Sequence, residues 1–359
     1  MPLVEYYFPQ ALSPARLDRF LAGGWFRSGA SLFRSKVLCL EGGLFSVVNI
    51  RVDVEKFKTS RSLRRLLKRN HPRFRLEFGK AEVNDRKEFL YQTHKHRFKG
   101  FIFESLEEFL FTGQAHLLFD MHELRIYDGD LLVGVSYFDK GQQAMASIMG
   151  LYDQEYARYS LGIYSMLQEV LLAQKEHKRF YYPGYILQGH SGFDYKMRLG
   201  HIQYYNWKGR WCDIKKLGEE YTVANELSQA LKVMETCLYQ YGMSYTRRLY
   251  PFFLIAYLGL KDHDFLGSAA YIWCFPDQEN EDHLIIEYSL DSNQYILSWA
   301  SPQHDTLDYS ETEFSQNFFN EKNYMKTLLA REDILLKSPS PSAIAQRVRK
   351  ISNTFLSYL

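Results

Sequence analysis

The pattern of apolar positions in the middle of the chain predicts a strand, strand, helix, strand unit. Continuous apolar runs at Leu131–Asp139 and Ala144–Asp153 are typical of buried strands. Ser160 then starts a segment that predicts a capped amphipathic helix of about five turns. Its apolar positions are Leu161, Tyr164, Leu167 and Leu171. After a third strand-like run at Phe180–Leu187, this order leaves the helix start beside a strand end, where free N–H groups can hold an acyl carbonyl or a phosphate.

The segments before this unit predict further elements. Val4–Phe8 reads as a short strand, and Ser13 precedes a proline at the start of a helix. The run Phe45–Val52 predicts another strand, and Ser105–Leu118 a helix-like linker. Asp128 and Gly129 form a two-residue turn signal that predicts a hairpin into the central unit.

The last part of the chain carries a different pattern. A regular amphipathic helix follows Trp211 and stops at Gly242, and a final helix is predicted to be capped by Ser342. Between them lie apolar runs and an acidic stretch without a recognisable catalytic motif. We therefore expect an α+β fold with a C-terminal extension of unassigned role.

Composition changes this picture in one respect, the distribution of charge. The 359 residues include 46% hydrophobic and 16% aromatic residues, enough for a large core and for two or three compact units. The net charge is only +2, but residues 51–100 contain sixteen Lys and Arg against six Asp and Glu. Residues 276–320 contain ten Asp and Glu and no Lys or Arg. A basic face for a polyanion is therefore expected in the N-terminal part.

Metal, membrane and export signals are not found in the sequence. The four cysteines are far apart, and a single cysteine, Cys39, cannot supply the ligands of a structural zinc or an iron–sulfur centre. We expect no metal and no cofactor. No apolar run reaches membrane-spanning length, and the first residues do not form a signal peptide. These features predict a cytoplasmic protein that does not bind a membrane.

The segment FKTSRSLRRLLKRN is the strongest candidate for a polyanion contact. Thr59 or Ser60 can cap a helix whose apolar face is formed by leucines. Its other faces carry only cations: Arg61, Arg64, Arg65, Lys68 and Arg69. Unpaired like charges repel, so a nucleic acid would stabilise this arrangement, although a solvated helix or pairing with distant acids are alternatives.

Three motifs of the central unit resemble the arginyl/leucyl-tRNA–protein transferase family. These are SLGIYSMLQE, YYPGYIL and FDYKMRL; the turn GWFRSGASLFR and the segment SRSLRR also resemble it. The resemblance covers the chain to Trp211 and implies an acetyltransferase-like (GNAT) mixed sheet flanked by helices, whose strands splay at the acyl site. It also implies a division into residues 1–104, an N-terminal α/β part with the basic helix; 105–217, the catalytic core; and 218–359, the extension.

The implied activity is that of an aminoacyltransferase. Such an enzyme moves Arg or Leu from a charged tRNA to the N-terminal amine of a protein that begins with an acidic residue, in the N-degron pathway. The implied catalytic residues are Tyr91, His94, Asp194, Tyr195 and Lys196. The implied substrate-binding residues are Trp25, Arg27, Ser28, Ser60, Arg61, Arg64, Arg65, Lys68, Arg69, Arg97, Ser160, Leu161, Gly162, Tyr182, Gly184 and Tyr185.

The reaction would be aminolysis of an activated ester, which needs no covalent intermediate and no metal. Placing amine and carbonyl together and stabilising the oxyanion supply most of the acceleration. One alternative is a divergent GNAT-like protein that binds tRNA or a protein without transfer. Another is an acyltransferase that uses acyl-coenzyme A. The sequence before Ser160 lacks the pyrophosphate-binding loop of such enzymes, which argues against this alternative.

Overall fold

The computed structural model describes residues 2–97, 103–218, 222–260, 263–276, 282–303 and 322–356. The chain divides by its contacts into two compact units. The core unit comprises Tyr6–Arg34 and Val47–Gly218. The C-terminal unit comprises Met1–Glu5, Ser35–Ser46 and Glu219–Leu359. The division into residues 1–104, 105–217 and 218–359 stays a prediction.

The core unit consists of strands and helices that alternate irregularly along the chain. Its strands are β1 (Val4–Tyr7), β2 (Phe26–Ser28), β3 (Ser31–Ser35), β5 (Gly43–Asp53), β6 (Phe74–Lys80), β7 (Met121–Asp128), β8 (Leu131–Lys140), β9 (Ala144–Tyr152), β10 (Phe180–Tyr182), β11 (Tyr185–Leu187), β12 (Ile202–Tyr205) and β13 (Trp211–Asp213). Parts of β1, β3 and β5 belong to the C-terminal unit. Its α-helices are α1 (Pro14–Ala22), α2 (Arg61–Asn70), α3 (Asp85–Lys95), α4 (Leu106–Phe111), α5 (Ala115–Leu118) and α6 (Leu161–Lys175). Its 3₁₀ helices are η1 (Thr112–Gln114), η2 (Gln154–Tyr159), η3 (Ser191–Leu199) and η4 (Ile214–Lys216).

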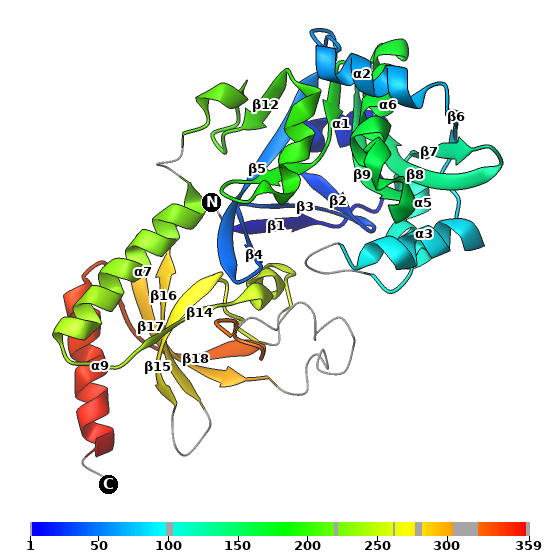
Figure 1. Ribbon diagram of the computed structural model, residues 1–359. Coiled ribbons are helices and arrows are strands. Elements are labelled where there is room, and N and C mark those ends of the chain that lie inside the picture. Colours follow the sequence, from blue (N-terminus) through cyan, green and yellow to red (C-terminus); the bar gives the residue numbers. More distant parts are fainter. Residues whose placement is uncertain are drawn as a thin grey trace. The chain divides into compact units, whose positions relative to one another are not determined.

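A large mixed sheet organises the core unit (Figure 1). Its strand order is β13-β12-β5-β10-β9-β8-β7-β6, and β11 and β4 (Val37–Leu40) pair with β5 beside this path. Pairs along the path are antiparallel except for β9 and β10, which are parallel. A parallel pair requires a crossover, and α6 provides it between β9 and β10.

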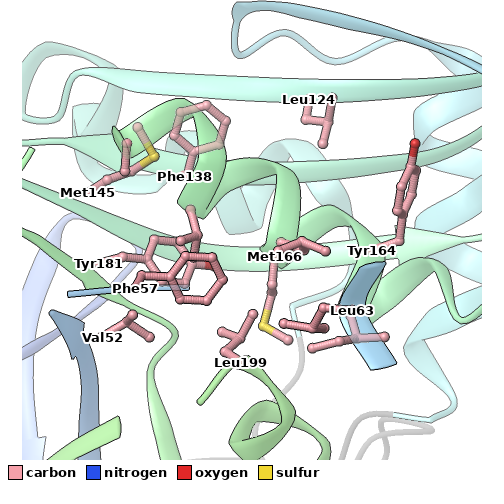
Figure 2. Packing of buried hydrophobic residues seen from close by; sticks show 14 of the residues in the cluster. Val52, Phe57, Leu63, Leu124, Phe138, Met145, Tyr164, Met166, Tyr181 and Leu199 are labelled. Atoms are coloured by element: carbon pink, nitrogen blue, oxygen red, sulfur yellow. The ribbon is translucent and has the colours of Figure 1, made fainter. Parts of the chain in front are cut away.

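Side chains on the two faces of the sheet pack into separate clusters. On β9, Met145 joins the cluster formed with α2 and α6, whereas its neighbours Ala144 and Ala146 join the cluster formed with α1. This alternation is the period-two pattern of a strand covered on both faces. Figure 2 shows the first cluster, in which Leu63 of α2 and Met166 of α6 lie close to each other. The apolar side of the basic helix is therefore fixed in the core, and its cations remain at the surface.

Most predicted elements of the core unit are confirmed, with two differences. The hairpin at Asp128 and the cap at Ser60 are present, and the hydroxyl of Ser60 accepts a hydrogen bond from the Leu63 N–H at 3.3 Å. The predicted capping of α6 by the Ser160 side chain is wrong, because Ser160 has φ 55° and its side chain makes no cap hydrogen bond. The single strand expected after α6 is two strands, because Pro183 cannot donate to a ladder and the chain changes partner there.

The C-terminal unit is an antiparallel sheet with helices. The strand order is β14-β15-β16-β17-β18. Its elements are β4 (Val37–Leu40), α7 (Val223–Gln240), β14 (Thr246–Leu249), η5 (Pro251–Tyr257), β15 (Ala270–Pro276), β16 (His283–Ser289), β17 (Gln294–Pro302), β18 (Leu329–Ser338) and α9 (Pro341–Leu356). The predicted amphipathic helix is confirmed as α7, whose buried face consists of Ala224, Leu227, Leu231, Met234 and Leu238.

The last helix begins differently from the prediction. The hydroxyl of Ser340, and not of Ser342, accepts a hydrogen bond from the first turn of α9, at 3.4 Å from the Ala343 N–H. The expected α+β class is confirmed by the mixture of helices and mixed sheet. The closer assignment to the acetyltransferase-like class stays a prediction. No helix among the described residues is both long and apolar enough to cross a membrane.

Candidate functional site

The candidate site begins where two parallel strands separate. β9 pairs with β10 only from Ala144 to Ala146, opposite Phe180–Tyr182. The chain then turns at Gly184, which has φ 92°, and continues as β11, paired with β5. β9 itself continues to Tyr152. Beyond Ala146 it pairs with β8 alone among the described strands. The sheet is therefore interrupted beyond Ala146, at the ends of two neighbouring strands.

The start of α6 lies at the far end of β9. A Cβ built on Gly162 would lie 3.7 Å from the Tyr152 ring, so the first turn of the helix is close to this strand end. Asn70 and Arg69 of α2 both donate hydrogen bonds to the Tyr159 carbonyl, at 2.9 and 2.7 Å. These bonds join the end of the basic helix to the residue that precedes Ser160. A cationic helix face and a helix N-terminus, two groups that attract anions, thus lie next to each other.

The basic helix α2 exposes cations without acidic partners. Arg61, Arg65 and Lys68 are exposed, and the described part of the chain places no carboxylate beside them. Arg64 donates to the Thr59 carbonyl at 2.9 Å, within its own helix start. The alternative reading, in which distant acids neutralise the helix, therefore finds no support in the described residues.

The end of α3 forms one wall near the strand end. His94 is buried, and its Nδ1 lies 3.2 Å from the Tyr152 carbonyl and 3.3 Å from the side-chain nitrogen of Gln154. Burial lowers the pKa of His94, so its imidazole is mainly neutral at pH 7. Arg97 is exposed and donates to the Tyr152 hydroxyl at 2.6 Å and to Gln154 at 2.9 Å. No acidic side chain pairs with Arg97 among the described residues.

The segment η3 brings Tyr195 and Lys196 to the turn after β10. Lys196 donates to the Tyr185 carbonyl at 2.9 Å, and its ammonium lies 5.4 Å from the centres of the Tyr185 and Phe193 rings. A Cβ on Gly184 would come within 3.3 Å of this nitrogen. Burial lowers the pKa of Lys196 to about 8. At pH 7 this lysine is therefore still mainly charged, but it gives up its proton more readily than an ordinary lysine.

Tyr195 is the residue that connects η3 to the rest of the site. Its side chain is 44% exposed, yet burial around the hydroxyl raises its pKa. The charges of Tyr152, Arg97 and Glu169 also act on this hydroxyl. The neighbouring Asp194 is exposed. Of the two, Tyr195 is the residue whose hydroxyl the structure brings toward α3 and α6.

Glu169 was not predicted from the sequence as a site residue. It lies on α6, on the side that faces β8 and β10. It is fully buried on α6, and it accepts hydrogen bonds from Ser136 of β8 and from Tyr181 of β10, the latter at 2.7 Å. The hydroxyl of Ser147 also interacts with the carboxyl group. Burial raises the pKa of Glu169 to about 7, against the lowering effect of these hydroxyls. The sequence held one signal, a single carboxylate within an otherwise uncharged helical run from Leu161 to Ala173.

The turn GWFRSG contacts the sheet, and its arginine, Arg27, already has partners within the protein. Arg27 forms a buried ion pair with Asp139 at 2.9 Å and donates to the carbonyls of Gly29 and Leu110, both at 2.7 Å. The side chains of this pair are only 2% and 1% exposed. This geometry fits a structural role for Arg27 better than a contact with substrate.

The other predicted site residues are distributed around the sheet. Trp25 is half-buried against Phe20 and under the guanidinium of Arg34, 4.9 Å from its ring centre, and Ser28 lies in β2. Tyr91 is buried and donates to the Phe103 carbonyl at 2.6 Å. Tyr182 is buried beside Trp211, with 5.7 Å between ring centres.

These placements sort the predicted residues into groups. The structure brings together His94, Arg97, Gly162, Gly184, Tyr185, Tyr195 and Lys196 around the interrupted strands. Ser160 and Leu161 belong to the same helix start, which α2 adjoins. Trp25, Arg27, Tyr91 and Tyr182 instead contact the packed core. The described residues contain no group of three or more His, Cys, Asp or Glu side chains that could hold a metal.

Comparison with known proteins identifies the class of protein to which this chain belongs. The family described as "Arginine-tRNA-protein transferase, C terminus" matches residues 79–206, which lie in the core unit and include most of this site. An aspartate/glutamate leucyltransferase of Xanthomonas oryzae pv. oryzae is 31% identical over 175 residues, 46% of this chain and 69% of the relative. One of Leptospira interrogans is 27% identical over 200 residues, 54% of this chain and 76% of the relative. The chain belongs to this family of aminoacyl-tRNA–protein transferases.

Solved structures show only distant likeness. The C-terminal domain of a putative lysylphosphatidylglycerol synthetase from Agrobacterium fabrum has a TM-score of 0.31 and 12% identity, over 50% of this chain and 53% of that one. L-PGS from Bacillus licheniformis has a TM-score of 0.29 and 11% identity, over 42% and 50%.

Proposed function

We propose that this protein transfers an amino acid from a charged tRNA to the N-terminal amine of proteins that begin with Asp or Glu. The observation that carries the proposal is the junction of α2 with the start of α6, next to the interrupted strands and Lys196. The names of the relatives favour leucine as the amino acid, whereas the family description names arginine. We propose leucine first, with arginine as the alternative.

The proposed tRNA contact is the cationic face of α2. The helix has ten residues, so the face extends over about 15 Å along the helix axis. Exposed Arg and Lys side chains bind phosphates without regard to sequence, and they release counterions when they do so. The end of α2 meets the start of α6, so a strand bound to α2 would lie close to the candidate site.

The proposed acceptor contact is Arg97. A negatively charged first residue needs a cation near the site, and Arg97 has no acidic partner among the described residues. Its two polar contacts, the Tyr152 hydroxyl and Gln154, are neutral. A carboxylate of the acceptor could therefore form a charge-assisted hydrogen bond with Arg97 without displacing an ion pair.

The proposed chemistry uses Lys196 at the leaving group. The ester is already activated, so the enzyme has to place the amine, stabilise the oxyanion and give a proton to the departing ribose oxygen. In its charged form Lys196 can donate that proton, because its pKa of about 8 makes it a stronger acid than an ordinary lysine. The α-amine of the acceptor has a pKa of about 8 as well, so its deprotonation needs only a modest base.

We further propose that the protein works in the cytoplasm, where charged tRNA is available, and that the added residue marks the acceptor in an N-degron pathway. The core of this activity would be residues 105–217 together with the basic helix of residues 1–104.

The test is a transfer assay with purified full-length protein. Radiolabelled Leu-tRNA and Arg-tRNA are each offered with peptides that begin with Asp, Glu or Ala, and label in peptide is counted. We expect label from one tRNA in the Asp and Glu peptides only. Arg97→Gln should reduce transfer to acidic peptides, and Lys208→Gln, an exposed cation outside the site, serves as its control. No label in any peptide while tRNA still binds would refute the transferase proposal in favour of a tRNA-binding protein.

A further inference from the structure

The proposed chemistry does not use the buried carboxyl of Glu169. Its partners come from three different strands: Ser136 of β8, Ser147 of β9 and Tyr181 of β10. Tyr195 of η3 is close enough for the charge of Glu169 to act on its hydroxyl. The three hydrogen-bonding partners are all hydroxyl groups, and no Lys, Arg or His pairs with Glu169 among the described residues.

A carboxylate buried without a cation is costly, because burial disfavours its charged form. A residue that only filled space here could be a glutamine, which makes similar hydrogen bonds without this cost. The position of Glu169 also differs from an ordinary core site. Ser147, which contacts it, is the first residue of β9 after the pairing with β10 ends, and it is half-exposed. Its hydroxyl therefore connects the buried carboxyl to the place where the strands separate.

We propose that Glu169 is the proton acceptor of the transfer reaction and acts through the hydroxyl of Ser147. This inference rests on the proposed function. Glu169 is a positioning residue in this scheme, since Ser147 alone would contact the substrate amine. The chemical class of its substrate is an α-ammonium group, the N-terminus of the acceptor.

The proton balance of the proposed step is complete without a co-reactant. The α-ammonium gives one proton to Ser147 as Ser147 passes its own to the Glu169 carboxylate. The neutral amine attacks the ester carbonyl, and a C–N bond forms. The C–O bond to the ribose then breaks, with a proton from Lys196 going to the ribose oxygen, and Lys196 regains a proton from the nitrogen that becomes the amide. Glu169 afterwards releases its proton to water.

This scheme predicts a bell-shaped pH dependence of kcat. Glu169 must be deprotonated and Lys196 protonated, and their pKa values of about 7 and about 8 place the maximum between them. The groups that face Glu169 are Ser136, Ser147, Tyr181 and Tyr195, and burial raises the pKa of both tyrosines. None of these four groups titrates near pH 7. Of the groups in this contact, Glu169 is therefore the one that gives an acidic limb near pH 7.

The experiment measures kcat for aminoacyl transfer at saturating tRNA and peptide from about pH 5.5 to about pH 9, a range that spans both predicted limbs. Glu169→Gln keeps the side-chain shape and should lower kcat about 100-fold or more, with loss of the part of the acidic limb that lies near pH 7. Ser147→Ala should lower kcat similarly while the carboxyl remains. Glu155→Gln removes the same charge from an exposed carboxyl in η2 and should leave the profile unchanged. Circular dichroism and thermal unfolding check that each variant folds.

A Glu169→Gln enzyme with the wild-type rate and acidic limb would overturn the relay while leaving the transferase proposal intact. Absence of transfer by the wild-type protein would overturn both. If Glu169→Gln does not fold, infrared titration of the wild-type protein with ¹³C-labelled glutamate decides the question. A buried carboxyl that titrates near pH 7, and is perturbed in Ser147→Ala, supports the relay. A carboxyl that stays protonated above pH 9 overturns it.

Discussion

The basic face of α2 offers the most quantitative prediction. The variant Arg61→Ala/Arg65→Ala/Lys68→Ala removes three exposed cations that have no acidic partner in the described structure. Leu63 and Leu66, which hold the helix in the core, are unchanged, and alanine has the highest helix propensity. The helix should therefore remain folded while its positive charge falls.

The size of the effect follows from counterion release. If all three side chains contact phosphates, the slope of log K against log salt should decrease by about 2 to 3, at 0.7–0.9 per contact. Between about 50 and about 200 mM salt, the affinity advantage of the wild type over the variant should then shrink about 20- to 40-fold. At low salt the variant should bind tRNA much more weakly than the wild type, and at high salt the two should approach each other.

The assay is the binding of fluorescently labelled tRNA, followed by anisotropy at several salt concentrations. A matched control, Lys232→Ala/Lys337→Ala/Arg349→Ala, removes three exposed cations from the C-terminal unit. The control should keep the wild-type slope. Equal slopes for the wild type and the α2 variant would refute the assignment of α2 to the tRNA backbone, even if transfer activity were lost.

Three further predictions concern side chains in and beside the site. Lys196→Met should abolish most transfer, but it should raise the free energy of unfolding at pH 7 by about 1–2 kcal/mol, because it removes a buried charge. Only the wild type should gain stability as the pH rises from about 8 toward about 10.5, because in that range its unfolded state binds more protons than its folded state. Gly184→Ala should lower transfer more than Gly189→Ala, because both have positive φ but only Gly184 adjoins the Lys196 ammonium; equal losses in the transfer assay would contradict this. Arg27→Ala should destabilise the fold by about 3–5 kcal/mol in urea unfolding, since it leaves Asp139 buried without a cation; a lower affinity for tRNA at unchanged stability would instead indicate a substrate contact.

Local patterns in the sequence predicted most elements of the core unit. Apolar periodicity located α6 and the strands before it, and the cap at Ser60 together with the leucines of α2 predicted the orientation of that helix. These signals are short-range, so they can be read from a few neighbouring residues. One strand was expected where the structure has two, although Pro183, which cannot donate to a ladder, was a local signal for the split.

Contacts between distant residues could not be predicted in the same way. Arg27 and Asp139 are 112 positions apart, and nothing in either local segment announces that they form a buried pair. Glu169 illustrates the same limit, because its meaning depends on hydroxyls from three strands that meet only in the fold. The side-chain cap predicted for α6 was wrong for a similar reason. The left-handed conformation of Ser160 is not evident from the neighbouring residues, and in it the side chain makes no cap hydrogen bond.

The ionisable groups around the interrupted strands favour catalysis over binding alone. A protein that only held tRNA would need exposed cations such as those of α2, and it would gain nothing from desolvating a lysine and a carboxyl in the same region. Burial lowers the pKa of Lys196 to about 8 and raises that of Glu169 to about 7, and both shifts reduce stability at neutral pH. Pairs of groups with pKa values displaced toward neutrality are typical of acid and base assignments in enzymes. The energetic cost is understandable if Lys196 and Glu169 exchange protons with the substrates, and the pH profile of kcat tests that explanation directly.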